Sequence, residues 1–221
     1  MKKVGKHKTE GARPKTNSFK NTHDRVLEKA LELFSKKGFE GATTREIAAV
    51  SGVSEVTLYR HFESKDDIFA QIAKRFSIVP LLKNIPSEVF RKPLKEKLKY
   101  IATGFFSIFK ERSAMMRIMF SEAVVHKQQA KMIFENIPLK ALNMISEMLE
   151  LEMAAGIIKK SNSRIISRLF LGMLLSYNIM NEMLYGKEYE QFDDNEVIEN
   201  IVNIYLKGIE KKHKMSCKEK S

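Results

Sequence analysis

Side chains that can hydrogen-bond to DNA gather in one short stretch of the chain, just after residue 43. Two short helices joined by a tight turn are expected there, with polar groups along their outer face. The residues expected on that face are Thr44, Arg45, Glu55, Val56, Thr57, Tyr59, His61 and Lys65. Two helices of this kind form a helix-turn-helix, whose second helix enters the major groove when the first holds it at a fixed angle. The stretch therefore predicts binding to double-stranded DNA.

Local signals define the ends of these two helices. Thr43 and Glu46 form a capping box, which satisfies free backbone N–H groups at a helix start. The sequence 51–53, Ser-Gly-Val, makes the turn, and Ser54 caps the second helix. The helix-turn-helix is therefore placed at about residues 43–62. The residues expected to pack the helices together are Ile47, Ala48, Ala49, Val53, Leu58 and Phe62.

Further helices flank this motif. Apolar residues between 26 and 34 recur at spacings of three and four, in a helix expected to begin near Thr22 and to stop at Gly38. Ser64 caps another helix, whose first turn carries Asp66 and Asp67, where the helix dipole favours acids. Together these helices make a small module of about the size of a DNA-binding domain.

The module resembles the TetR family of bacterial regulators. The matching residues are Phe34, Gly38, Thr43 to Ala48, Gly52 to Ser54, Thr57 to Phe62, and Lys65. The resemblance covers about residues 22–80, and the remainder agrees with the family only in the number and order of its expected helices. It implies an all-α fold of about nine helices, with an N-terminal helix-turn-helix DNA-binding domain and a larger C-terminal helical domain for ligand binding and dimerisation.

On this basis we expect four regions: a basic flexible arm at residues 1–21, a DNA-binding domain at 22–80, a regulatory and dimerisation domain at 81–212, and a Lys-rich tail at 213–221.

The family pattern implies two groups of DNA contacts. Phosphates would be held by Thr43 and Thr44, at a helix N-terminus, and by Tyr59, His61 and Lys65. The residues nearest base edges would be Arg45, Glu55, Val56 and Thr57, and Ser54 is expected to be a further DNA-binding residue. Arg45 could bond guanine, Glu55 could accept from cytosine N4, and the methyl groups of Val56 or Thr57 could touch thymine.

Simpler roles remain open for several of these residues. Thr43 can be a cap alone, and Glu55 can stabilise its helix dipole without touching DNA. Tyr59 can be a packing residue, and His61 can form a local hydrogen bond. Glu55 and Val56 also depart from the family pattern, which often has a small or basic residue there. The resemblance therefore does not imply an operator sequence.

Bulky, soft side chains are concentrated in the expected C-terminal domain, where the resemblance implies a pocket for an inducer. Methionine and phenylalanine can line an adaptable pocket for an apolar or amphipathic ligand, although an ordinary core has the same composition. The candidate pocket residues are Phe105, Phe109, Met115, Met119, Phe120, Met144, Met148, Phe170, Met173 and Tyr177. Polar anchors could come from Arg112, Arg117, Glu122 or His126.

Two expected helices, at 163–185 and 193–212, are apolar around most of their circumference. Such helices must be buried on several sides, so we expect them to pair with their symmetry mates in a homodimer. A twofold dimer would present two recognition helices to a palindromic operator, with half-sites about one DNA turn apart. A small-molecule inducer would change that spacing through the helix at residues 65–80.

Other functions find little support in the sequence. A Gly-rich phosphate loop, a nucleophile elbow and the HExxH and CxxC patterns are all missing, so we expect no enzyme, no catalytic residues, no metal and no cofactor. Cys217 is the single cysteine, which favours a reducing compartment, and the polar first 18 residues do not resemble a signal peptide. We expect a cytoplasmic, nucleoid-associated protein without a membrane partner.

The charge distribution is consistent with DNA as the partner. The net charge is +12, but residues 26–75 carry eight basic and eight acidic residues. Residues 1–25 instead carry eight basic residues and two acids, so the arm can contribute phosphate contacts that the module does not. We expect a repressor that an inducer releases from its operator. The alternatives are a nucleoid-organising or cell-division factor of the same fold, or an adaptor that no longer binds DNA.

Overall fold

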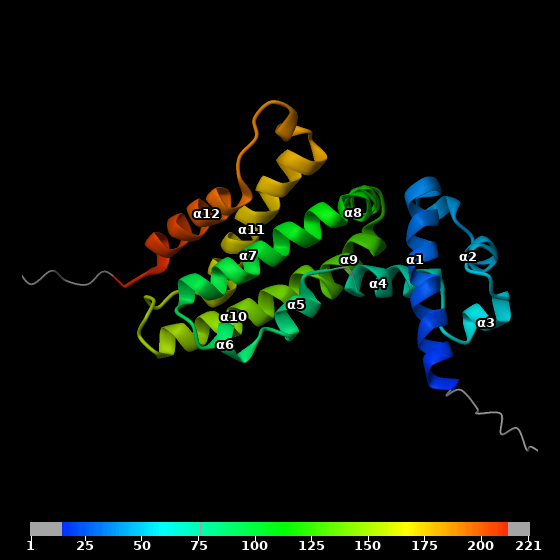
Figure 1. Cartoon of the computed structure of the whole chain (residues 1–221), viewed down its shortest axis with the longest axis horizontal. Coiled ribbons are helices and arrows are strands. Elements are labelled where there is room, and N and C mark those ends of the chain that lie inside the picture. Colours follow the sequence, from blue (N-terminus) through cyan, green and yellow to red (C-terminus); the bar gives the residue numbers. More distant parts are fainter. Residues whose placement is uncertain (1–14, 76, 212–221) are drawn as a thin grey trace, which may run out of the picture. The chain divides into compact units, whose positions relative to one another are not determined.

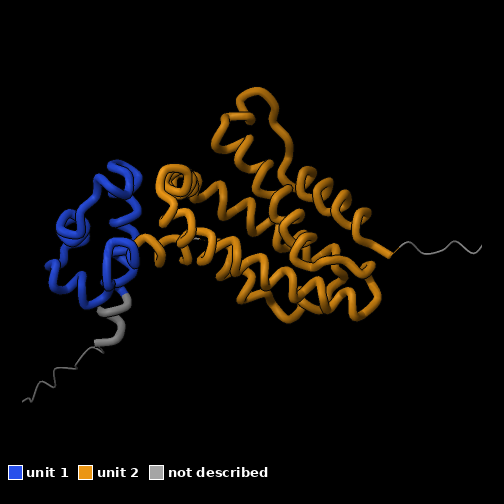
Figure 2. Tube along the Cα trace, turned by 180° about the vertical axis from the view of Figure 1, so that it is seen from behind, with its two compact units in different colours: residues 1–68 blue, residues 69–221 orange. Residues whose placement is uncertain are grey.

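The computed structural model describes residues 15–75 and 77–211, with residues 15–20 as backbone only, and its regular elements are all helices (Figure 1). The all-α prediction is therefore confirmed for this part of the chain. The chain divides into two compact units, residues 1–68 and residues 69–221 (Figure 2). None of the described helices is long and apolar enough to cross a membrane. The predictions for most of the basic arm, and for the tail with Cys217, concern residues outside the described ranges.

Unit 1 is built on one long helix. α1 (Lys15–Gly41) is followed by two short helices, α2 (Thr44–Val50) and α3 (Glu55–Tyr59), and by the first turn of α4 (Lys65–Arg75). Their apolar side chains share one core, which includes Val26, Leu27, Ala30, Phe34, Phe39, Ile47, Ala48, Leu58, Phe62 and Ile68. The expected packing residues are buried, except that Val53 is half-buried and Ala49 is exposed.

Gly38 interrupts α1 where the sequence predicted its end. Its backbone has φ 72° and ψ 173°, a conformation that is essentially restricted to glycine. The chain then buries Phe39, whose ring centroid lies 5.5 Å from that of Phe34. The start of α1 differs from the prediction, because the helix begins at Lys15 rather than near Thr22. No glycine or proline lies between these two positions to stop it, so part of the predicted flexible arm is helical.

Unit 2 is a bundle of helices around a single core. After the rest of α4 it contains α5 (Val79–Lys83), α6 (Ser87–Phe90), α7 (Leu94–Glu111), α8 (Ser113–Val125), α9 (Lys127–Asn136), α10 (Pro138–Ala154), α11 (Ser163–Asn178) and α12 (Asp194–Ile209). α10 packs chiefly against α11, and α12 packs chiefly against α7. The short helices α5 and α6 lie between the longer helices α4 and α7.

The core of unit 2 ties α11 to α12 through an aromatic pair. The rings of Phe170 and Tyr205 lie 5.0 Å apart, and the Tyr205 hydroxyl donates to the carbonyl oxygen of Ile166 at 2.9 Å. Burial raises the pKa of Tyr205, so this hydroxyl stays protonated and remains a donor. The two helices predicted to form the dimer, α11 and α12, therefore pack directly against each other within one chain.

A glycine allows α5 to lie close against α7. A Cβ atom at Gly104 would come within 2.1 Å of the Leu81 side chain, so the leucine fills space that any other residue would occupy. The chain segment that precedes α5, residues 77–78, is buried in the same region of unit 2. Close packing at Gly104 therefore holds α5 against α7.

Two predicted boundaries differ from the structure. The compact units meet inside α4, between Ile68 and Phe69, rather than at residue 80, so α4 belongs to both units. The helix predicted at 163–185 is α11 followed by one π-helical turn, Ile179–Met183, and it ends before Tyr185, which has φ 59°.

Candidate nucleic-acid interface and ligand cavity

The start of α2 is held by the predicted capping box. The Thr43 hydroxyl accepts from the Glu46 backbone N–H at 3.2 Å, and the Glu46 carboxylate accepts from the Thr43 N–H at 3.0 Å. Lys37 reaches the same carboxylate from α1 at 2.5 Å. The hydrogen bond from Lys37 and those from Thr43 lower the pKa of Glu46 from 4.5 to about 2. The cap is therefore an ionised group at neutral pH.

The turn between α2 and α3 depends on Gly52. Its φ is 65°, which an L side chain rarely adopts, although open space surrounds the position of a Cβ. Across the turn the Val53 N–H donates to the Ala48 carbonyl at 3.0 Å. The Arg25 side chain of α1 donates to the Ser51 carbonyl at 2.9 Å, so the end of α2 is also fixed to the long helix.

The second helix presents a narrow exposed face. The Ser54 hydroxyl accepts from the Thr57 N–H at 3.1 Å and lies 2.9 Å from the Thr57 hydroxyl, so these two side chains serve the cap. Glu55 is exposed, and the exposed fractions of Val56 and Tyr59 are 73% and 52%. Glu55, Val56 and Tyr59 are therefore the groups of α3 most accessible to a partner.

Two of the predicted phosphate contacts lie side by side. The Thr44 hydroxyl, in the first turn of α2, is 3.1 Å from the Tyr59 hydroxyl at the end of α3. Arg45 is exposed beside them, at the next position of α2. The pair joins two helices and forms a compact group of hydroxyl donors close to a helix N-terminus.

Lys65 has an intramolecular role that the sequence analysis did not foresee. Its ammonium group donates to the carbonyl oxygens of Phe39 at 2.9 Å and Ala42 at 3.1 Å, and it lies 4.3 Å from the centre of the Phe39 ring. The lysine therefore satisfies carbonyl groups where α1 ends. Two of its three N–H donors are used within the chain.

His61 is half-buried rather than openly exposed. Its ring lies 6.2 Å from that of His23, which stacks on Phe62 at 4.7 Å. Burial, and then the positive charges of His23 and Arg60, lower the pKa of His61. The imidazole is therefore mostly neutral at neutral pH, which weakens its suitability as a phosphate contact.

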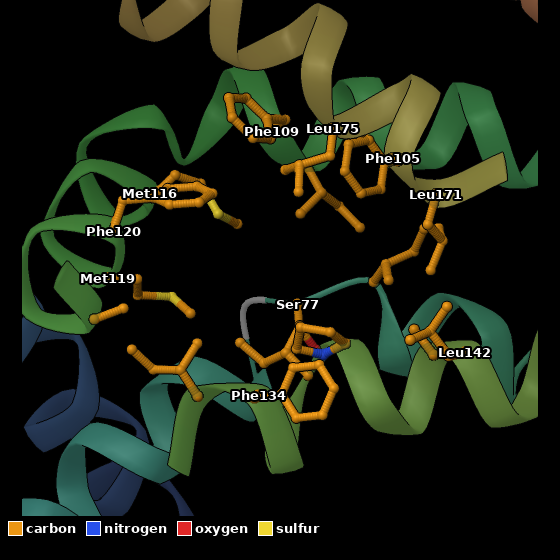
Figure 3. A pocket seen from close by; sticks show the side chains of 18 of the residues that line it. Ser77, Phe105, Phe109, Met116, Met119, Phe120, Phe134, Leu142, Leu171 and Leu175 are labelled. Carbon is orange, nitrogen blue, oxygen red and sulfur yellow. The ribbon is translucent and has the colours of Figure 1, made fainter. Parts of the chain in front are cut away.

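Unit 2 contains an apolar cavity with a volume of about 340 Å³ (Figure 3). Its wall comes from α7, α8, α9, α10 and α11, together with Ser77 and Ile78. In Figure 3, Phe105 and Phe109 lie on one side of the cavity and Phe134 on the other. Arg168 is the charged residue of the wall, and Ser77 supplies its hydroxyl group.

The cavity contains some of the predicted pocket residues and excludes others. Those in its wall are Phe105, Phe109, Met119 and Phe120. Outside it, Met115 is buried in α8, Met148 and Phe170 belong to the core of unit 2, and Met144, Met173 and Tyr177 pack against that core. Residue type alone did not separate the two groups, because the same soft side chains serve both.

The predicted polar anchors also lie outside the cavity wall. Arg117 donates to the carbonyl oxygens of Glu182 and Met183 and lies 5.1 Å from the Tyr185 ring, so it holds the end of the π-helical turn. His126 is the C-cap of α8, and its imidazole Nε2 lies 3.6 Å from the carboxylate of Glu122 in the same helix. Arg112 is half-buried at the start of α8. Arg168, which lies in the wall, was not predicted, since nothing in the local sequence distinguishes it from other exposed arginines.

The outer face of α11 is apolar and exposed. Ile165 and Leu169 have exposed fractions of 57% and 58%, and they lie on one side of the helix with Gly172 and Ser176. Met180, in the π-helical turn that follows α11, is also 58% exposed. On α12, Ile204 is 61% exposed and shares its side with Gly208. Apolar and small residues on exposed helix faces are typical of helix–helix interfaces.

The geometry of unit 1 is that of a helix-turn-helix DNA-binding protein. Residues 26–72 match the sequence profile described as "Bacterial regulatory proteins, tetR family", and residues 96–208 match the "AefR-like transcriptional repressor, C-terminal domain". The chain belongs to the TetR family of transcriptional regulators. The prediction of that family is therefore confirmed.

Individual relatives agree with this assignment. The chain is 27% identical over 169 residues to the uncharacterised regulator YerO of Bacillus subtilis, covering 75% of this chain and 57% of YerO. It is 23% identical over 190 residues to YvkB of the same organism, covering 85% of this chain and 97% of YvkB. The structure of the regulator FadR from Bacillus subtilis with stearoyl-CoA superposes with a TM-score of 0.68 at 19% identity, over 85% of this chain and 99% of FadR.

Within the described ranges, no group of three histidine, cysteine, aspartate or glutamate residues could hold a metal ion.

The lowered pKa of Glu46 predicts a pH-dependent contribution to stability. Because the folded state lowers this pKa from 4.5 to about 2, the ionised cap stabilises the fold fully above pH 4.5 and is lost as the pH falls towards 2. We expect Glu46→Gln to lower the urea midpoint at pH 7 and to make the midpoint fall less on acidification than in the wild type. Glu40→Gln, at an exposed glutamate of α1, is the control. An equal fall for wild type and Glu46→Gln would contradict the assignment.

Proposed function

We propose that this TetR-family regulator is a homodimeric repressor that binds a palindromic operator and releases it when an apolar or amphipathic ligand enters the cavity of unit 2. The observation that carries the proposal is the apolar cavity, whose wall includes Ser77 next to the end of α4. The description of the C-terminal profile as that of a transcriptional repressor supports the direction of regulation. The stearoyl-CoA bound to FadR supports a ligand of apolar character.

DNA would be held by the Thr44–Tyr59 pair and read by α3. Two hydroxyl groups beside the N-terminus of α2 suit one phosphate, because the free N–H groups and the helix dipole there favour an anion. Arg45, Glu55 and Val56 are exposed and supply the base contacts. Thr43, Ser54 and Thr57 act chiefly as caps, and Lys65 contributes to phosphate binding only through its remaining N–H group.

Ser77 gives the cavity a connection to α4. Its hydroxyl donates to the carbonyl oxygen of Lys74, in the last turn of α4, at 2.9 Å and accepts from the Val79 N–H at 3.2 Å. A ligand in the cavity would directly contact Ser77, which connects the end of α4 to the start of α5. Movement of α4, whose first turn belongs to the DNA-binding unit, would then change the spacing of the two recognition helices in the dimer.

Removal of either hydroxyl of the Thr44–Tyr59 pair is expected to weaken DNA binding about tenfold, since a hydrogen bond to a charged group is lost. Tyr59→Phe and Thr44→Val should affect operator and random DNA alike, because phosphate contacts carry no sequence information. Their effects should not add, because the two groups are in contact. Fluorescence anisotropy with labelled DNA measures this, with Tyr189→Phe as control at an exposed tyrosine of unit 2. Wild-type affinity in both variants would refute the assignment.

The DNA itself is found by selecting bound fragments from the source genome. One or a few sites with inverted half-sites are expected for an operator-specific repressor. Many closely spaced sites would instead favour the nucleoid-organising or cell-division alternative.

The dimer would form through the outer faces of α11 and α12. Leu169→Arg is expected to convert the dimer to a monomer in sedimentation equilibrium, because a charge would be buried in an apolar interface. Leu151→Arg is a matched control, since Leu151 of α10 has the same exposed fraction, 58%. If Leu169→Arg stays dimeric, or if Leu151→Arg dissociates equally, the interface lies elsewhere.

A further inference from the structure

The wall of the cavity carries positive charge but no negative charge. Its residues are apolar or small apart from Ser77 and Arg168, and no acidic residue is among them. The Ser77 hydroxyl already donates to one backbone group and accepts from another, so it offers little to a ligand. Arg168 is therefore the one group of the wall that can bind a charged atom strongly.

Arg168 lies at the edge of the cavity, where its charge remains accessible to solvent. It is an exposed residue of α11, and its guanidinium carbon is 5.8 Å from the centre of the Phe134 ring, which is itself part of the wall. Within residues 21–75 and 77–211 it forms no ion pair with a carboxylate. Its donors are thus available to an anion, and an aromatic ring orients the guanidinium.

The volume limits the apolar part of a ligand. At about 30 Å³ for each water-sized group, a cavity of 340 Å³ holds roughly ten such groups. A methylene group is similar in size to water, so an alkyl chain of about ten carbon atoms would fill the space.

We propose that the cavity binds a single-chain amphiphile of about ten carbon atoms whose anionic end group pairs with Arg168. This inference rests on the proposed ligand-binding role of the cavity and adds the charge and size of the ligand. A carboxylate and a phosphate share the required chemistry, because the guanidinium fork donates two parallel hydrogen bonds to either. A neutral amphiphile gains nothing from Arg168, and a cationic one is repelled.

Calorimetric titration of the purified full chain, without DNA, tests the proposal with four ten-carbon probes. These are decanoate, decyl phosphate, 1-decanol and decyltrimethylammonium, each below its micelle concentration. At least one of the two anions should bind about tenfold or more tightly than 1-decanol, and the cation should bind most weakly. The anion that binds more tightly identifies the source as a fatty acid or a phosphate ester.

Variants separate the charge from the cavity. Arg168→Gln should weaken binding of the preferred anion about tenfold and leave 1-decanol within about twofold, and Arg168→Lys should retain part of the preference. Arg164→Gln is the matched control, one turn earlier on α11 and outside the wall. Ala123→Leu should weaken every probe, because Ala123 of α8 belongs to the wall and a longer side chain there would reduce the space for a ligand.

Equal binding of 1-decanol and the anions, tightest binding of the cation, or unchanged anion binding in Arg168→Gln would each overturn the proposal. Because no DNA is present, this result is independent of whether a ligand releases the operator. A protein that binds decanoate through Arg168 and keeps its DNA would contradict the proposed function alone.

Discussion

The short helices of unit 1 depend on having their ends satisfied. α2 has seven residues and α3 has five, which is too short for a helix to be stable by itself in water. Thr43 and Glu46 cap α2, Ser54 caps α3, and Lys65 binds the carbonyl groups where α1 ends. The surface that we propose to face DNA is therefore stabilised by the paired hydrogen-bond donors and acceptors at the helix ends and by the small apolar core beneath them.

The features that the sequence predicted well are local ones. A capping box, a glycine turn and an apolar stripe each depend on residues a few positions apart, so Thr43, Gly52 and the core around Leu58 could be placed without a structure. Lys65 and His61 were placed less well. Their surroundings come from residues more than twenty positions earlier, namely Phe39, Ala42 and His23 for these two side chains.

The residues of the cavity wall were also difficult to predict, because they come from distant parts of the sequence. Its wall combines segments from Ser77 to Leu175, and the composition of a helix does not reveal which of its sides faces a cavity. Four of the ten candidate residues lie in the wall because α7 and α8 both contribute to it, whereas Phe170 and Met148 point into the core of unit 2. Arg168 could be recognised only when the structure placed it beside Phe134.

In the proposed mechanism the apolar cavity is coupled to DNA binding through α4, and thermodynamic linkage tests this coupling directly. If a ligand lowers the affinity for DNA, DNA must lower the affinity for the ligand by the same factor. The measurement is the dissociation constant of decanoate for the free protein and for the protein saturated with its selected genomic fragment. We predict that decanoate binds the DNA complex more weakly than the free protein, by a factor of about 5 to 150. Equal affinity in the two states would contradict it.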